Sequence, residues 1–161
     1  MTKLSEYDRI NTNLAFVFIL SYRQQVTRKA EHMDINGKCR KLPVLRTRKV
    51  EWGGGEQKNG VISLPFPIYG KEVDDWIGML YSLKLTDQNY LENYDAIQSR
   101  LGTEGISLKD SIAQLSRDEV LTVMTFIVRK ERFCDGTIAH ALEDGTLEAL
   151  CVRLRAVTSD V

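Results

Sequence analysis

The sequence predicts a mainly helical (α+β) fold: one compact helical domain with a small two-stranded β-hairpin. Apolar residues recur at helical spacing over most of the chain. One predicted helix, from Ser116 to Phe133, is apolar around most of its circumference. Two short runs between residues 44 and 64, separated by consecutive glycines and followed by prolines, predict the hairpin. We therefore expect about six helices, packed around the one that begins at Ser116.

The helix from Ser116 to Phe133 is expected at the centre of the domain. Ser116 and Glu119 have the spacing of a capping box, in which the two side chains accept backbone N–H groups at the helix start. The apolar residues from Val120 to Val128 point in too many directions to form a single stripe. Neighbouring elements should pack on more than one side of this helix.

Length and composition indicate an ordinary globular protein. A domain of 161 residues buries roughly 68 to 70% of the surface of its unfolded chain, so it needs no disulfides for a core. The longest apolar run, from Leu14 to Leu20, is far shorter than the roughly 20 residues that a membrane helix needs. The polar start before this run does not resemble a signal peptide. We expect a cytoplasmic protein without a membrane segment.

The cysteines and histidines suggest no cofactor. Cys39, Cys134 and Cys151 are widely separated and form no C-x-x-C pair, and His32 and His140 have no familiar ligand spacing relative to them. We expect buried free thiols, no structural metal and no cofactor.

The net charge of zero conceals an asymmetry. Residues 1–70 hold 12 Lys and Arg against 6 Asp and Glu, and residues 71–161 hold 10 against 16. Such a bipolar chain can form a head-to-tail homodimer, can present a basic face to an acidic partner, or can neutralise its two halves within one fold. The sequence does not choose among these arrangements.

The first half of the chain is predicted to contain a helix, a basic segment and the hairpin. The helix spans residues 5 to 27, and the strands span Val44–Trp52 and Val61–Leu64. Pro65 and Pro67 should end the second strand, because proline cannot donate to a ladder. In a single domain spanning residues 1–161, the basic segment 28–49 and the glycine-rich loop 53–60 are then inserted between the first helix and the helical remainder.

The glycines at 53–55 favour a hairpin connection over a phosphate-binding loop. A phosphate-binding loop needs further glycines at set intervals, a lysine and a helix directly behind it, and none of these follows.

Further helices are predicted from Gly70 to Lys84, from Tyr90 to Leu101 with a stop at Gly102, and as a short segment that starts at Ser107. After the central helix, the tripeptide Asp-Gly-Thr occurs at 135–137 and again at 144–146. In each copy the glycine can end one helix in a left-handed conformation and the threonine can cap the next. This pattern predicts two sharp corners, a short helix Thr137–Asp144 and a last helix Thr146–Ala156.

The segment Met124 to Gly136, MTFIVRKERFCDG, and the leucine- and arginine-rich helix after it resemble a family of small uncharacterised bacterial and phage-associated domains. The matching residues are Thr125, Arg129, Arg132, Phe133, Asp135, Gly136, Gly145, Leu150, Arg153 and Leu154. Leu64–Tyr69 and the following helix also look like this family, so that about half of the chain is covered. The resemblance implies a fold and a region of interest, and it implies no activity.

A polar stripe on the central helix supplies candidate site residues. Thr125, Arg129 and Arg132 share one face, and Asp135 follows closely. In the first interpretation, Asp135 pairs with the two arginines and fixes the corner at Gly136. In the second, the guanidinium groups line a groove that binds a phosphate, a carboxylate or a protein partner.

Enzymatic interpretations lack support in the sequence. His140 and Asp144 could share a helix face beside Cys134, but nothing constrains them to meet. No familiar hydrolase, zinc-protease or nucleotide-binding motif is present. We assign no catalytic residue, and we regard an unrecognised enzyme with a pocket at Arg129, Arg132 and Asp135 as the third hypothesis.

The favoured function is non-catalytic binding to a protein partner by a small intracellular accessory or regulatory protein, in the context of phages or mobile elements. The alternative is a nucleic-acid-binding protein that uses the basic segment 28–49. The candidate basic patch consists of Arg28, Lys29, Lys38, Arg40, Lys41, Arg46, Arg48 and Lys49. Nucleic acid is the less favoured partner, because Trp52 is the only aromatic residue near the segment that could stack on a base.

Overall fold

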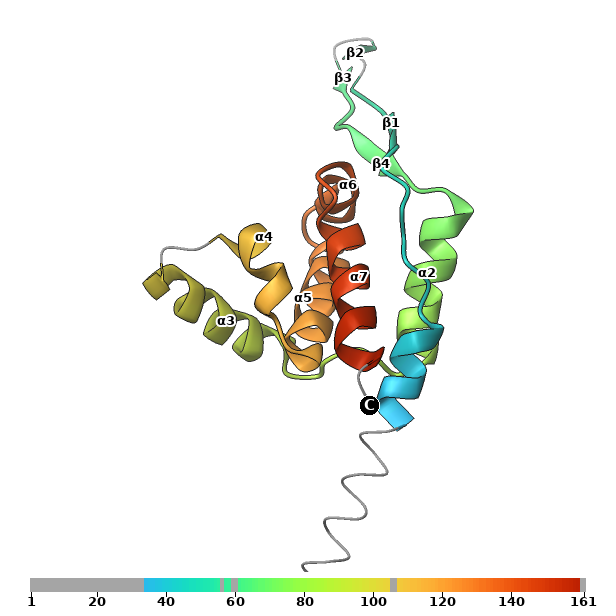
Figure 1. Ribbon diagram of the computed structural model, residues 1–161. Helices are drawn as coiled ribbons and strands as arrows, with labels where there is room; N and C mark the ends of the chain where they lie inside the picture. The colour runs from blue at the N-terminus through green and yellow to red at the C-terminus, as the bar shows by residue number, and fades with distance from the viewer. Residues whose placement is uncertain (1–33, 56, 59–60, 105–106, 160–161) are drawn as a thin grey trace, which may run out of the picture. The chain divides into compact units, whose positions relative to one another are not determined.

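The computed structural model describes residues 34–55, 57–58, 61–104 and 107–159 (Figure 1). The chain divides into two units, Met1–Gly37 and Lys38–Val161, and the second holds nearly all the described residues. This unit is mainly helical with a small antiparallel hairpin, which confirms the predicted fold class. The predicted helix over residues 5–27 and the candidate cations Arg28 and Lys29 lie outside the described residues. A single domain over the whole chain stays a prediction.

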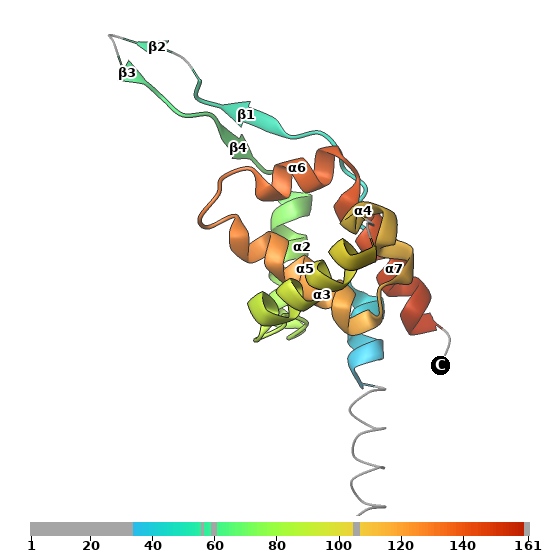
Figure 2. The same ribbon diagram turned by 90° about the vertical axis from the view of Figure 1, so that its left-hand side faces the viewer.

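The helices of this unit surround α5, as the two views in Figures 1 and 2 show. They are α2 (Lys71–Ser82), α3 (Tyr90–Glu104), α4 (Leu108–Ser111), the short 3-10 helix η1 (Ile112–Gln114), α5 (Arg117–Lys130), α6 (Thr137–Glu143) and α7 (Thr146–Ser159). Helices α3, α6 and α7 all contact α5. Residues 38–41 are also helical.

The central helix α5 has the predicted start and the predicted burial. Ser116 Oγ accepts the N–H of Glu119 (3.3 Å), and Glu119 Oε2 accepts the N–H of Ser116 (2.8 Å), which confirms the capping box. Its buried residues are Val120, Leu121, Thr122, Val123, Met124, Thr125, Ile127 and Val128. The helix ends at Lys130, before the predicted end at Phe133, and the Phe133 side chain is exposed.

The hairpin contains four short strands, β1 (Glu51–Gly53), β2 (Gln57–Lys58), β3 (Val61–Ile62) and β4 (Phe66–Ile68). β1 pairs with β4 and β2 with β3, both antiparallel. Three residues separate the pairs on each side, so the register is the same in both, and residues 51–68 form one β arm. Gly54 and Gly55 interrupt the arm at φ values of 75° and 77°. The glycines therefore lie between the two pairs of strands, β1–β4 and β2–β3, and interrupt the arm there.

Two strand predictions need correction. The strand predicted over Val44–Trp52 is a strand only from Glu51, because a strand requires a backbone partner and residues 44–50 have no pairing strand within the described ranges. Pro67, expected to end a strand, lies within β4 opposite Trp52. Proline is tolerated there because β4 is an edge strand.

The run from Leu42 to Val50 lies along the helices and leads into β1. Leu42 and Leu45 are buried. Trp76 Nε1 donates to the carbonyl oxygen of Pro43 (3.1 Å), and Arg155 Nη2 donates to that of Leu42 (3.4 Å). The first part of this run is therefore held by α2 and α7.

The corners before α6 and α7 contain the two predicted left-handed glycines, Gly136 (φ 93°) and Gly145 (φ 80°). The predicted threonine caps are wrong, because Thr137 and Thr146 are already the first residues inside their helices. Thr137 Oγ1 donates to the Cys134 carbonyl (2.8 Å), and the amide of Thr146 donates to Asp144 Oδ1 (2.8 Å).

Candidate functional site

The β1–β4 pair has two faces with different surroundings. Side chains alternate between the faces of a strand, so Trp52 and Pro67 share one face while Phe66 and Ile68 share the other. Phe66 and Ile68 lean over Gly53: a Cβ at Gly53 would lie 2.7 Å from Phe66 Cζ and 3.3 Å from Ile68 Cδ1. The absence of a side chain at Gly53 thus makes room for both.

The Trp52 face is attached to α6. Trp52 Nε1 donates to Glu143 Oε1 (3.2 Å), and its ring centroid lies 6.1 Å from that of His140. A Cβ on Gly136 would lie 2.9 Å from the tryptophan ring, so this glycine is needed for close approach as well as for its left-handed backbone. This face of the arm is fixed to the helices.

The other face presents apolar side chains to solvent. Leu64, Phe66 and Ile68 are 81%, 48% and 48% exposed, and we call them the apolar arm surface. Figure 2 shows the strands of the arm extending away from the helices. Large exposed apolar patches are found at interaction sites, so the apolar arm surface is a candidate site.

Glu131 joins the base of the arm to α5 and α6. Its carboxylate accepts the Tyr69 hydroxyl (2.6 Å) and the N–H groups of Gly136 (3.0 Å) and Ile138 (2.7 Å). The Tyr69 oxygen accepts the N–H of Ala139 (3.2 Å). Burial, together with the hydrogen bond to Glu131, raises the pKa of Tyr69, so the hydroxyl stays protonated and donates.

The predicted polar stripe faces the loop between α2 and α3. Thr122, which lies three residues before Thr125 on α5, donates its Oγ1–H to Asp87 Oδ2 (2.7 Å), and the Asp87 N–H donates to Thr125 Oγ1 (3.0 Å). Burial opposes ionisation of Asp87, but hydrogen bonds from Asn93, Thr122 and the Asn89 amide outweigh it and lower the pKa of the carboxyl. Thr125 is fully buried, so this candidate residue supports the loop.

The remaining stripe residues lie apart. The Arg129 guanidinium stacks over the Tyr90 ring, 5.0 Å from its centroid. Arg132 and Asp135 are exposed. Within the described residues, no hydrogen bond or ion pair joins Asp135 to either arginine. The chain brings Thr125 into contact with Asp87, places Arg129 against Tyr90, and leaves Arg132 and Asp135 at the surface.

Some side chains of the basic segment 28–49 form contacts that stabilise the fold. Arg40 Nη1 donates to the Thr158 carbonyl at the end of α7 (2.7 Å), and Arg48 forms an ion pair with Glu148 (2.7 Å). Lys41, Arg46 and Lys49 are exposed. Lys38 is half-buried. The predicted patch is thus divided between side chains that hold α7 and side chains that face solvent.

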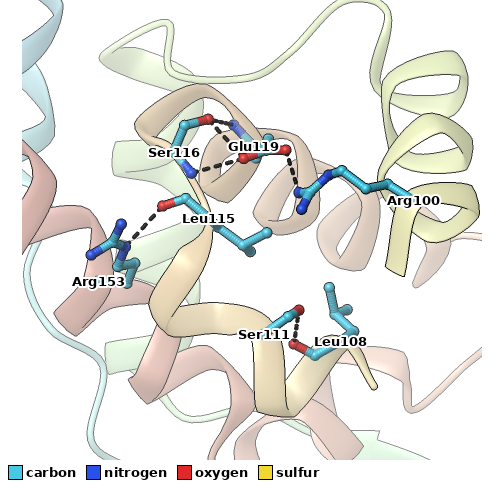
Figure 3. Close-up of polar contacts among 7 residues, drawn as sticks. All are labelled: Arg100, Leu108, Ser111, Leu115, Ser116, Glu119 and Arg153. Atoms are coloured by element: carbon cyan, nitrogen blue, oxygen red, sulfur yellow. Dashed lines mark hydrogen bonds and ion pairs between the residues drawn. The ribbon is translucent and has the colours of Figure 1, made fainter. Parts of the chain in front are cut away.

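A cavity of about 430 Å³ lies between α3 and α5, lined by Asn93, Ala96, Ile97, Arg100, Asp118, Glu119 and Thr122. Figure 3 shows Arg100 reaching from α3 to Glu119 at the start of α5, where Nη2 and Oε1 are 2.6 Å apart. Arg153 supports the same corner by donating to the Leu115 carbonyl (2.8 Å). Hydrogen bonds from Ser116 and the Arg100 side chain outweigh the burial of Glu119 and lower its pKa. Two charged groups of this cavity, Arg100 and Glu119, therefore hold α3 against α5, and Asp118 pairs with Arg117.

The thiols are free, and two of the three are buried. Burial raises the pKa of Cys39 to about 11 and also raises that of Cys151, so neither is a thiolate at neutral pH. Cys134, expected to be buried, is exposed because it lies in the turn after α5. Over the described ranges, no three His, Cys, Asp or Glu side chains lie close enough to hold a metal ion.

Sequence reasoning missed Glu131, Tyr69 and Asp87. Glu131 lies seven residues before Ile138 and 62 after Tyr69, so no helical spacing relates them. One local signal was available for Asp87: it precedes Asn89 by two residues, the spacing of an Asx turn, and its Oδ1 does accept the Asn89 N–H (2.8 Å).

The described helices include none that is long and apolar enough to cross a bilayer. The chain has no significant match among curated proteins or solved structures. Residues 40–160 match a family of unknown function, DUF6508. That match includes the residues from Met124 onward, and it agrees with the predicted resemblance to an uncharacterised domain. The chain therefore belongs to the family of unknown function DUF6508.

Proposed function

We propose that this protein is a non-catalytic binding protein that recognises a protein partner through the apolar arm surface. The observation that carries the proposal is the exposure of Leu64, Phe66 and Ile68, at 81%, 48% and 48%. Fully burying a side chain of this size stabilises a complex by about 1.5 to 3 kcal/mol. The arm contributes little to the helical core, so its apolar residues are better explained by an external partner.

The cytoplasm is the proposed compartment, and phage or mobile-element biology the proposed setting. Three free thiols, one of them exposed at Cys134, suit a reducing environment. The setting is supported only by the resemblance of the segment from Met124 to Gly136.

Affinity capture with matched variants tests the proposal. The full chain, the double variant Phe66→Ser/Ile68→Ser and the control Leu91→Ser are used as baits in the same lysate. Leu91 is 58% exposed on α3, so the control removes a comparable apolar side chain away from the arm. We expect a protein that the full chain and Leu91→Ser retain and the double variant loses. Identical captured proteins from all three baits would refute the proposal.

Nucleic-acid binding by the segment 28–49 is the second candidate, favoured by the exposure of Lys41, Arg46 and Lys49. It is weaker because Arg40 and Arg48 are engaged in contacts with α7. Phosphate contacts give a steep salt dependence, with a log-log slope of roughly −0.7 to −0.9 per contact. Titration of labelled oligonucleotides at about 50 and 200 mM salt measures this slope.

An enzymatic pocket at Arg129, Arg132 and Asp135 is the third candidate. The cavity between α3 and α5 is lined by other residues, and Arg129 is stacked on Tyr90. The geometry therefore gives this candidate the least support.

A further inference from the structure

The outer edge of β1 carries main-chain groups that point away from the hairpin. Proline has no N–H, so Trp52 and Pro67 form the non-hydrogen-bonded pair of the β1–β4 ladder. In such a pair the N–H and C=O of each residue face away from the partner strand. The N–H and C=O of Trp52 consequently point outward, and outside the ladder no described residue makes a backbone hydrogen bond to them.

The residues before β1 also have backbone groups on this outer edge. Figure 1 shows an extended connection running from the end of the first helical residues into β1. Val50 precedes Trp52 by two residues, so in extended backbone its N–H faces the same edge. The sequence predicts a strand over 44–52, but only its last residues pair within the described part of the chain. Residues 46–53 are therefore a continuous run whose outer edge is unpaired within the described part of the chain.

Free positive charge accompanies this edge. Arg46 and Lys49 are exposed, and neither forms an ion pair with a described residue. Arg48, between them, is neutralised by Glu148. On the neighbouring face, Phe66 and Ile68 lean over Gly53 toward the same edge.

We infer that residues 46–53 accept an extended, acidic segment of a partner protein as an added β-strand on the outer edge of β1. Main-chain hydrogen bonds give such a complex its affinity and alternate side chains give it specificity. Carboxylates of the added strand would meet Arg46 and Lys49, and its apolar residues would cover Phe66 and Ile68. The inference rests on the proposed function and names the class of partner.

A second copy of this chain fits the edge poorly. The run 46–53 holds Arg46, Arg48 and Lys49 against Glu51, so pairing of two copies brings two segments of the same net charge together, which is unfavourable. An acidic segment has the opposite effect, because its charges complement Arg46 and Lys49.

The test is selection of a displayed library of random peptides on the full chain, followed by affinity measurements on the enriched peptides. We expect acidic peptides with alternating apolar residues. Val50→Pro removes an outward N–H, and Arg46→Glu/Lys49→Glu reverses the charges; each should weaken binding at least about tenfold. Thr47→Pro, whose N–H faces the other edge, and Lys84→Glu/Lys130→Glu, which reverses two exposed cations outside this run, are the matched controls and should change affinity less than about twofold.

Several outcomes would overturn the inference: no enriched peptide, enriched peptides that are basic, or binding that Val50→Pro leaves unchanged. A further outcome is that peptides bind Val50→Pro as tightly as the natural chain and fail to bind Phe66→Ser/Ile68→Ser. This result would refute the added strand and would be consistent with the proposed function. If Phe66→Ser/Ile68→Ser also captures the same proteins from the lysate as the natural chain, both the added strand and the proposed function are refuted. Unfolding temperatures of all variants establish that each is folded.

Discussion

Helix α5 and the β arm are both rich in apolar residues, but they use them differently. α5 begins at a capping box and buries residues on several sides against α3, α6 and α7. The arm is attached at its base through Trp52 and Tyr69, and it leaves Leu64, Phe66 and Ile68 exposed. The comparison teaches that apolar content alone does not identify a core. The covering neighbours decide whether a side chain stabilises the fold or is available to a partner.

The largest expected effect comes from removing core volume in α5. Met124 is fully buried, so Met124→Ala should destabilise the domain by about 2 to 5 kcal/mol through lost burial and the cavity left behind. Urea denaturation measures the change. The control Leu91→Ala, at an exposed position on α3, should cost less than about 0.5 kcal/mol. Equal losses in the two variants would contradict the central role of α5.

A smaller effect is expected where the arm meets the helices. Glu131→Ala removes the acceptor of two buried amides and of the Tyr69 hydroxyl, and should cost about 1 to 3 kcal/mol. Asp135→Ala is the control, because Asp135 is exposed and no described residue forms a hydrogen bond or ion pair with it. It should change stability by less than about 0.5 kcal/mol. A larger loss for Asp135→Ala would instead support the network with Arg129 and Arg132 that the sequence predicts.

The pH dependence of stability probes the loop that α5 supports. The pKa of Asp87 is lowered in the folded state, so its contribution is complete above the ordinary aspartate value of about 3.9 and is lost as the pH falls through the lower folded value. The difference in unfolding free energy between the natural protein and Asp87→Asn should therefore be constant near neutrality and shrink below about pH 4. A difference that grows on acidification would show that the pKa is raised.

The smallest effect on stability is expected on the apolar arm surface. Phe66→Ser/Ile68→Ser replaces side chains that are already half exposed, so the thermal unfolding temperature should fall by only a few degrees, about 1 kcal/mol or less. A loss comparable with that of Met124→Ala would mean that the arm belongs to the core, and it would remove the basis of the proposed function.

Local features were predictable from the sequence, and contacts between distant segments were not. The capping box of α5 and the corners at Gly136 and Gly145 depend on residues within a few positions of each other. The helices follow from periodicity, which each segment carries by itself. The anchor between Tyr69 and Glu131 depends on a meeting across 62 residues, and nothing in local spacing distinguishes Glu131 from a solvent-facing glutamate.

The candidate site shows the same limit. The composition of the sequence identifies the basic segment. Only the structure shows that Arg40 and Arg48 bind α7, whereas Arg46 and Lys49 form no such contact and are exposed. The strand prediction over 44–52 holds only for Glu51 and Trp52. It could not tell that the pairing strand for most of this run is absent from the described part of the chain.

The anchor at Glu131 has a consequence for amide hydrogen exchange. At the start of α6, the N–H groups of Gly136, Ile138 and Ala139 donate to side chains that come from α5 and from the base of the arm. Their exchange with solvent requires these side chains to separate, without any need for α6 itself to unwind. The Ala139 amide, which donates to Tyr69, therefore reports in the intact protein how often the base of the arm detaches, and the amides of Gly136 and Ile138 report how often Glu131 separates from α6.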